Sequence, residues 1–186
     1  ARLYLAAPRG FQAKPLMGSA SGIPVQARDT LVAEEVKVCI DVRLAAQPLS
    51  LGHATLRVVP GPRRELCPPI PWGELWRVRA ASDRVGVRLE GESAEHGIEL
   101  PSEPMCVGAI QATPGGGLLI LGPDGPTIGG YPHVATVIDA DLDRVGQLRP
   151  RDTLRFEETT FEAAAAARSE YLDRLERVRR QLLLRA

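Results

Sequence analysis

The chain is poor in lysine, in aromatic residues and in long apolar runs, and each scarcity excludes something. Lys14 and Lys37 are its two lysines, and Lys+Arg and Asp+Glu both number 23, so no net charge attracts nucleic acid or a membrane surface. No stretch approaches the roughly 18 consecutive apolar residues that a membrane-spanning helix needs, and the start does not resemble a signal peptide. We therefore expect a cytoplasmic protein that binds neither nucleic acid nor a membrane.

Metal and disulfide chemistry have as little support. Cys39, Cys67 and Cys106 are odd in number and widely separated, without a C-x-x-C pair. The histidines are equally isolated and show no ligand spacing: His53, His96 and His133. The sequence predicts buried, reduced thiols and no metal site.

Short alternating segments dominate what is present. With 44% hydrophobic and 25% charged residues, the 186-residue chain can build a real core, in one domain or two small ones. In residues 36–44 every even position is apolar, as in a half-buried strand. Further strands are predicted over 2–6, 55–59, 75–80, 85–90, 118–121, 134–138 and 153–157. Glycine and proline separate these runs, a pattern that favours a sandwich or a barrel.

The end of the chain changes to a helical pattern. Residues 159–162, Thr-Thr-Phe-Glu, predict a capping box, and five alanines follow at 163–167. The helix is supported by three oppositely charged pairs at i,i+4, namely 170/174, 173/177 and 176/180. Its apolar stripe packs on this domain by default; a partner subunit or a coiled-coil mate are the alternatives.

Three turns are candidates for chemistry. The triple glycine at 115–117 lacks the Gly-Lys pair of a phosphate-binding loop and is explained by a hairpin turn. Residues 82–91 place Arg84 where it can bind a carboxylate or an amide, although a surface turn capped by Asp83 explains the same pattern. At 128–138, Gly129 and Gly130 lead into an apolar strand, either as a backbone joint or as a ligand loop.

Several short segments, taken in order, form a series. They are Gly61-Pro62, residues 82–91, Ser102-Glu103, residues 108–111, residues 127–132, 135–138 and 140–142, residues 147–150 and Arg155-Phe156. Together they resemble the allophanate hydrolase subunit 2 family. That family includes the C subunit of the bacterial 5-oxoprolinase complex, part of the carboxyltransferase domain of urea carboxylase, and a protein that antagonises a sporulation kinase inhibitor. The resemblance covers residues 1–160 and only the later part of a typical member, without the N-terminal Thr-Val-Gln-Asp-x-Gly-Arg-like motif.

The resemblance implies a mainly β fold, a cyclophilin-like β-barrel with a C-terminal α-helix. We expect residues 1–158 to form the carboxyltransferase-like barrel domain and 159–186 the helix. It also implies a sister subunit of related fold, of the allophanate hydrolase subunit 1 type, with a third, lactam-binding subunit as an open alternative. The chain has no biotin-attachment motif, so ATP or carboxybiotin would be supplied through partner subunits and no cofactor is assigned to this chain.

The resemblance also suggests site residues. Arg84, Gln111, Gly129, Gly130 and Tyr131 match its motif positions and are the substrate-binding candidates; no catalytic residue is assigned. Arg84 would hold a carboxylate or polarise an amide oxygen, and Gln111 would hydrogen-bond a urea-like or lactam group. The Gly129-Gly130 backbone would donate N–H groups to a developing oxyanion.

Two departures from the family pattern keep a second interpretation open. Ala20 replaces an arginine in the first loop, and residues 125–128 replace an arginine, a glutamine and a threonine with small or apolar residues. A site that recognises a polar substrate usually keeps such groups. The sequence favours a subunit of an ATP-dependent amidolyase of the 5-oxoprolinase type, or a carboxyltransferase component acting on a urea- or lactam-like amide. The alternative is a non-catalytic regulatory or protein-binding member.

Overall fold

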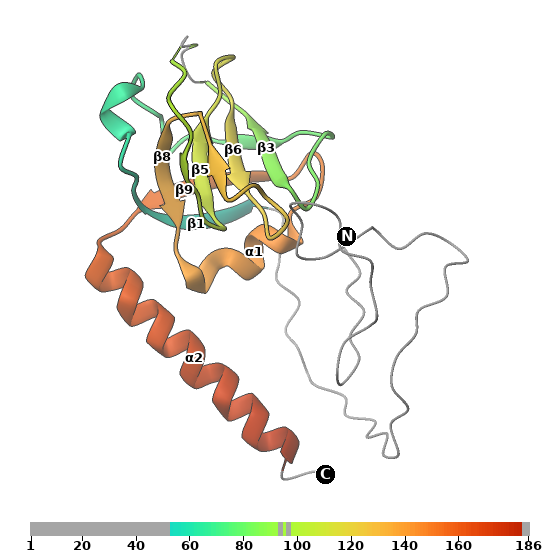
Figure 1. The fold of residues 1–186 in the computed structure, drawn as a ribbon. Coiled ribbons are helices and arrows are strands. Elements are labelled where there is room, and N and C mark those ends of the chain that lie inside the picture. The colour runs from blue at the N-terminus through green and yellow to red at the C-terminus, as the bar shows by residue number, and fades with distance from the viewer. Residues whose placement is uncertain (1–52, 93–94, 96–97, 184–186) are drawn as a thin grey trace, which may run out of the picture.

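Seven strands close into a barrel. The computed structural model describes residues 53–92, 95 and 98–183, so the strands predicted over 2–6 and 36–44 and the loop at Ala20 lie outside the described residues. In spatial order the strands are β1 (His53–Pro60), β8 (His133–Val137), β5 (Ala109–Ala112), β6 (Leu118–Leu121), β3 (Gly86–Glu90), β2 (Trp76–Val78) and β9 (Thr153–Glu158). All neighbours are antiparallel except β9 and β1, whose parallel pairing completes the barrel (Figure 1). The predicted mainly β barrel with a C-terminal helix is confirmed.

Strand β5 was not predicted from the sequence. All four of its residues are buried, so it shows none of the alternation that marks the other strands. Its outer face is covered by a second, two-stranded sheet formed by β4 (Glu103–Pro104) and β7 (Ile128–Gly129), through contacts described below. This extra layer explains why a barrel strand can be buried on both faces.

The barrel interior is filled by aliphatic side chains and one aromatic cluster. Its largest fully buried members include Leu56, Trp76, Ile110, Ile120 and Leu154. The edge of the Phe156 ring meets those of Trp72 and Trp76, with centroid distances of 5.5 and 6.4 Å. These contacts lie where β9 joins β2 and β1, and they stabilise the closure.

Helical segments lie at the turns and at the end of the chain. They are η1 (Arg64–Leu66), η2 (Asp139–Asp141), α1 (Leu142–Gln147) and α2 (Phe161–Leu183). The predicted C-terminal helix is confirmed, but its cap is Thr160, whose Oγ1 accepts a hydrogen bond from the Ala163 N–H at 3.2 Å. Thr159, the first residue of the predicted capping box, instead donates its N–H to the Val58 carbonyl at 2.8 Å. The strand ladder therefore ends one residue before the helix cap.

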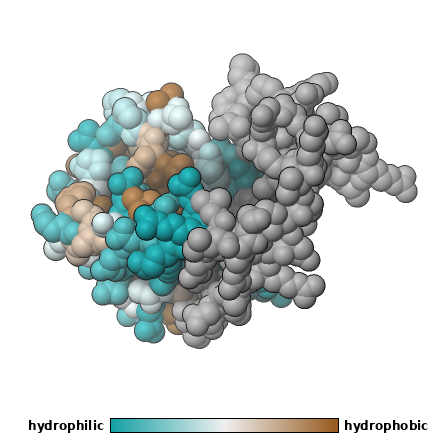
Figure 2. All heavy atoms as spheres, turned by 90° about the horizontal axis from the view of Figure 1, so that it is seen from below, coloured by the Kyte–Doolittle hydropathy of each residue, from teal (hydrophilic) through white to brown (hydrophobic). Residues whose placement is uncertain are grey.

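Helix α2 is attached to the barrel by its first half. Arg168 forms a 2.8 Å ion pair with Asp139, and the Tyr171 hydroxyl donates to the Asp143 carboxylate at 2.8 Å. Farther along, Leu172 is 46% exposed and the helix runs away from the strands (Figure 1). The view from below shows a largely hydrophilic surface with small apolar patches (Figure 2). Packing on the barrel thus holds for the start of α2, and no described helix is long and apolar enough to cross a bilayer.

Candidate functional site

The β4–β7 sheet brings two motif segments into one layer beside the barrel wall. Glu103 pairs with Gly129, and two further backbone bonds extend the ladder, from Met105 N–H to the Thr127 carbonyl and from Leu100 N–H to the Gly130 carbonyl, both at 2.8 Å. A Cβ on Gly130 would lie 3.0 Å from the Leu100 carbonyl oxygen, so only glycine fits without displacement. The glycine pair is therefore a close backbone joint.

Gln111 lies beneath this sheet on β5 and is 3% exposed. Its Nε2 donates to the Tyr131 carbonyl at 3.3 Å and lies 3.7 Å from the Met105 sulfur. A Cβ on Gly129 would come within 2.5 Å of the same nitrogen, which explains why a glycine stands there. Within the described part of the chain, Oε1 of Gln111 accepts no hydrogen bond, so this buried amide keeps one unused acceptor.

His133 stands opposite Gln111 in the register between β5 and β8. Its Nε2 lies 2.8 Å from the Thr136 hydroxyl, and the residue is 9% exposed. Burial lowers the pKa of His133 below its ordinary value, against a hydrogen bond with the Ala135 backbone and the charge of Glu103, which both act to raise it. The ring is therefore neutral near pH 7, with one nitrogen that donates and one that accepts.

The turn after β1 supports this arrangement from the other side. The Gly61 N–H donates to the Val134 carbonyl at 2.9 Å, and the Arg63 N–H donates to the His133 carbonyl at 3.0 Å. The Arg63 side chain reaches the Glu103 carboxylate at 2.8 Å. A positive and a negative side chain thus tie the β1 turn to β4 and place the Glu103 charge near His133.

Four groups therefore meet between the barrel wall and the β4–β7 sheet, and we call them the Gln111 cluster: Gln111, His133, Thr136 and the Tyr131 carbonyl. Tyr131 itself is 37% exposed, and Gly129 and Gly130 are half-buried, so the cluster lies just below the surface. Of the predicted site residues, the structure brings together Gln111, Gly129, Gly130 and Tyr131.

Arg84 occupies a different turn. It forms a bidentate ion pair with Asp124, through Nε and Nη2 at 2.6 and 3.0 Å. Asp83 accepts hydrogen bonds from the Val85 and Gly86 N–H groups, as predicted for a capped surface turn. The carboxylate predicted to be held by Arg84 is thus present within the chain itself. This pair fixes the turn after β6 to the turn before β3.

The sequence interpretation missed His133, Thr136, Glu103 and Arg63. His133 was set aside because it has no histidine or cysteine neighbour at ligand spacing, and its partner is a threonine. The signal that could have found it is its place directly after Gly-Gly-Tyr-Pro at the start of a buried strand.

The thiols and the acidic residues add no metal chemistry to the site. No group of three His, Cys, Asp or Glu side chains is arranged to hold a metal ion in the part of the chain that the structure describes. Burial raises the pKa of the Cys67 thiol, which keeps it protonated near pH 7. Cys106 is exposed, so the prediction of buried thiols is wrong for this residue, which lies in the turn between β4 and β5.

The comparisons with known proteins fit the barrel and the clustered motifs. A family model described as "Carboxyltransferase domain, subdomain A and B" matches residues 1–158. The chain belongs to this carboxyltransferase domain family. The Gln111 cluster is built from family segments that are scattered along the sequence and meet in the fold.

Similar proteins extend the comparison. The chain is 38% identical to the C subunit of 5-oxoprolinase from Haemophilus influenzae over 112 residues, which are 58% of the chain and 36% of that protein. It is 27% identical to the corresponding 5-oxoprolinase protein of Escherichia coli over 196 aligned positions, covering 91% of the chain and 60% of that protein. The solved urea amidolyase of K. lactis superposes with a TM-score of 0.62 at 26% identity, over 69% of the chain and 9% of that structure. This carboxyltransferase-family chain thus spans less than two thirds of the length of these relatives.

Proposed function

We propose that this chain is a subunit of an ATP-dependent amidolyase of the 5-oxoprolinase type, or a carboxyltransferase-like component that acts on a urea- or lactam-like amide. The observation that carries the proposal is the Gln111 cluster, which gathers neutral donors and acceptors beside a glycine-pair backbone. An amide substrate offers one carbonyl oxygen and N–H groups, and neutral polar groups of both kinds match it. Family membership and the similar proteins support the same chemistry.

Each group of the cluster has a role in this proposal. Gln111 orients the Gly129–Tyr131 backbone through the Tyr131 carbonyl, and its unused Oε1 accepts an amide N–H of the substrate. The Gly129 and Gly130 N–H groups face the oxyanion that develops when the amide carbon is attacked. His133, neutral and paired with Thr136, moves a proton at its Nε2.

The activated group comes from other subunits in this proposal. ATP or carboxybiotin is supplied through a sister subunit of related fold, of the allophanate hydrolase subunit 1 type, and a third subunit binds the lactam. The whole assembly works in the cytoplasm. These assignments rest on the 5-oxoprolinase and urea amidolyase relatives, which are named as subunits or as multi-step enzymes.

The test is reconstitution with the partner subunits that co-purify from the native host, followed by an assay of ATP-dependent 5-oxoproline hydrolysis. Gln111→Leu should lower turnover by about tenfold or more, because it removes the amide that orients the glycine pair and one polar contact in the transition state. Gln147→Leu is the matched control, since Gln147 is exposed at the end of α1. Equal activity of the two variants would refute the role of Gln111.

A second experiment separates two roles for Arg84. If Arg84 acts by holding Asp124, then Arg84→Gln and Asp124→Asn should reduce activity to the same extent, because each breaks the same bidentate pair. If Arg84 binds the substrate directly, Asp124→Asn should leave most of the activity and Arg84→Gln should remove it. The structure favours the first outcome.

A non-catalytic, protein-binding function is the second candidate. It is favoured by the apolar surface of β7, where Ile128 is 60% exposed beside the partly exposed Tyr131. Under this alternative a partner binds tightly without turnover, or loses its own activity on binding. Ile128→Ser should then weaken partner binding by about tenfold while leaving the barrel stable.

A further inference from the structure

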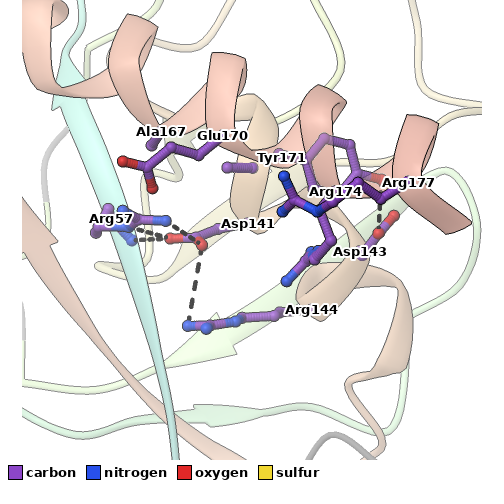
Figure 3. A pocket seen from close by; sticks show the side chains of 10 residues that line it. Arg57, Asp141, Asp143, Arg144, Ala167, Glu170, Tyr171, Arg174 and Arg177 are labelled. Atoms are coloured by element: carbon purple, nitrogen blue, oxygen red, sulfur yellow. Dashed lines mark hydrogen bonds and ion pairs between the residues drawn. The ribbon is translucent and has the colours of Figure 1, made fainter. Parts of the chain in front are cut away.

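We propose that the cavity between α2 and the α1 end of the barrel binds a small oxyanion through Arg144, Arg174 and Arg177. The cavity has a volume of about 330 Å³, within the range of small-molecule sites (Figure 3). It is lined by Arg57, Ala140, Asp141, Asp143, Arg144, Ala167, Glu170, Tyr171, Arg174 and Arg177. We call it the α2 cavity.

Arg57 and Asp141 neutralise each other at the base of the α2 cavity. Asp141, 1% exposed, accepts hydrogen bonds from the Arg57 backbone N–H, Nε and Nη2 at 2.9, 2.9 and 2.8 Å. Burial by itself raises the pKa of Asp141, but the bonds from Arg57 outweigh it and hold that pKa below its ordinary value. This pair is therefore a fixed, fully engaged wall, and the ligand must be held by the other arginines.

Three further guanidinium groups face the same space from two elements. Arg144 of α1 donates one N–H to the Thr55 carbonyl at 3.1 Å and lies 3.9 Å from Asp141, which leaves other donors unused. Arg174 and Arg177 stand three residues apart on α2, on one face of the helix, and both side chains extend from it toward the cavity in Figure 3. Neither forms an ion pair within the described residues. Arg174 is held over the Tyr171 ring, 5.4 Å from its centroid.

The charges favour an anion over a cation. Once the Arg57–Asp141 pair is set aside, three arginines face two carboxylates, those of Asp143 and Glu170. One of these, Asp143, already accepts the Tyr171 hydroxyl. Guanidinium groups bind carboxylate and phosphate oxygens through two parallel N–H bonds, so the arginine excess selects a small molecule that carries one of these groups.

Calorimetric titration of the full chain at low ionic strength tests this site with two probes, succinate and inorganic phosphate. We expect saturable binding of at least one probe at one site per chain, and the tighter probe identifies a carboxylate or a phosphoryl ligand. Arg174→Gln and Arg177→Gln should each weaken binding by about tenfold, the typical effect of losing a charge-assisted hydrogen bond. Arg179→Gln is the control, because Arg179 pairs with Glu176 outside the cavity.

A gain-of-affinity variant guards against loss through misfolding. Asp143→Asn keeps an oxygen for the Tyr171 hydroxyl but removes a carboxylate that repels the ligand, so binding should tighten several-fold. The proposal fails if the native chain binds neither probe saturably. It also fails if Arg179→Gln weakens binding as much as the cavity variants do, or if Asp143→Asn does not strengthen it.

Discussion

The Gln111 cluster and the α2 cavity place polar side chains in two different ways. The first is buried between two β layers and is made of neutral groups, with His133 kept uncharged by its burial. The second is open and made of charges, and its one deeply buried carboxylate, Asp141, is matched by a bidentate guanidinium. The difference follows from desolvation, since an unpaired charge is too costly in the first environment and is tolerated in the second.

The same comparison separates the elements that must stay fixed from those that can move. Around the Gln111 cluster, backbone segments approach so closely that glycine is required, as at Gly61 and Gly129. Along α2, side chains make the contacts, as in Arg168–Asp139 and Tyr171–Asp143, and both pairs are exposed. We therefore expect variants at the first region to change global stability and variants at the second to act locally.

The largest effect is expected from Gly61→Ala. The added Cβ would lie 2.4 Å from the His133 carbonyl oxygen and 2.6 Å from the Ala135 nitrogen, so β1 and β8 would have to separate. Urea unfolding should show a loss of about 3 kcal/mol or more. Gly115→Ala is the control, because nothing lies within 4 Å of its Cβ position. Equal stability of the two variants would show that the β1 turn adjusts and that the wall is not rigid.

Asp141→Asn should follow in size. It removes the carboxylate that pairs with the Arg57 guanidinium, and it leaves that charge beside a neutral amide. We expect a loss of about 2–3 kcal/mol in chemical unfolding at pH 7, less than for a fully buried pair because the Arg57 side chain is 37% exposed and water can solvate it.

The pH dependence of this variant provides a check. Because the pKa of Asp141 is lowered by folding, its contribution is present above the unfolded value of about 3.9 and is lost as the pH falls through the folded value. The native chain should therefore lose stability more steeply than Asp141→Asn in that acid range. Parallel curves would contradict the pairing.

A smaller, pH-dependent effect is expected at His133. Because folding lowers its pKa, the unfolded chain binds the proton more readily, and stability falls as the pH drops below the unfolded value of about 6.5 toward the folded value. His133→Gln keeps a polar group for Thr136 and cannot titrate, so thermal unfolding midpoints should lose this slope between pH 7 and pH 5. A slope retained in the variant would assign the titration to another group.

The smallest effect is expected from Tyr171→Phe. It removes the hydroxyl that donates to Asp143, one of the side-chain ties between α2 and the barrel. The cost is about 0.5–1 kcal/mol, and it should appear as faster amide exchange along α2 with no change in the barrel strands. Tyr131→Phe, in the β4–β7 region, should leave α2 exchange unchanged. Faster exchange throughout the barrel would mean that α2 is part of the global folding unit.

The local elements could be predicted because their signals lie within a few residues. Alternation identifies β1 and β9, the Asp83 turn closes on its own backbone, and Gly116 N–H bonds the Thr113 carbonyl in the hairpin turn at 115–117. The start of α2 needs only a hydroxyl three residues before an N–H, as in Thr160 and Ala163. Such contacts form without knowledge of the rest of the chain.

The site could be predicted only in part. The motif positions Gln111, Gly129, Gly130 and Tyr131 do meet, but nothing in their spacing shows that Gln111 would be buried beneath its neighbours. The Arg84–Asp124 pair joins residues 40 positions apart, and the Arg57–Asp141 pair joins residues 84 apart. Sequence patterns without pairing information do not assign such partners.

Local sequence signals are enough to specify a mainly β chain with a C-terminal helix and a family resemblance, because periodicity, turn residues and short motifs are properties of neighbouring residues. The closure of the barrel by β9 against β1, the cover on the outer face of β5 and the place of His133 opposite Gln111 come from the folded structure alone. So does the meeting of arginines from α1 and α2 at one cavity. These outcomes depend on which surfaces lose water together, and burial is a property of the whole fold.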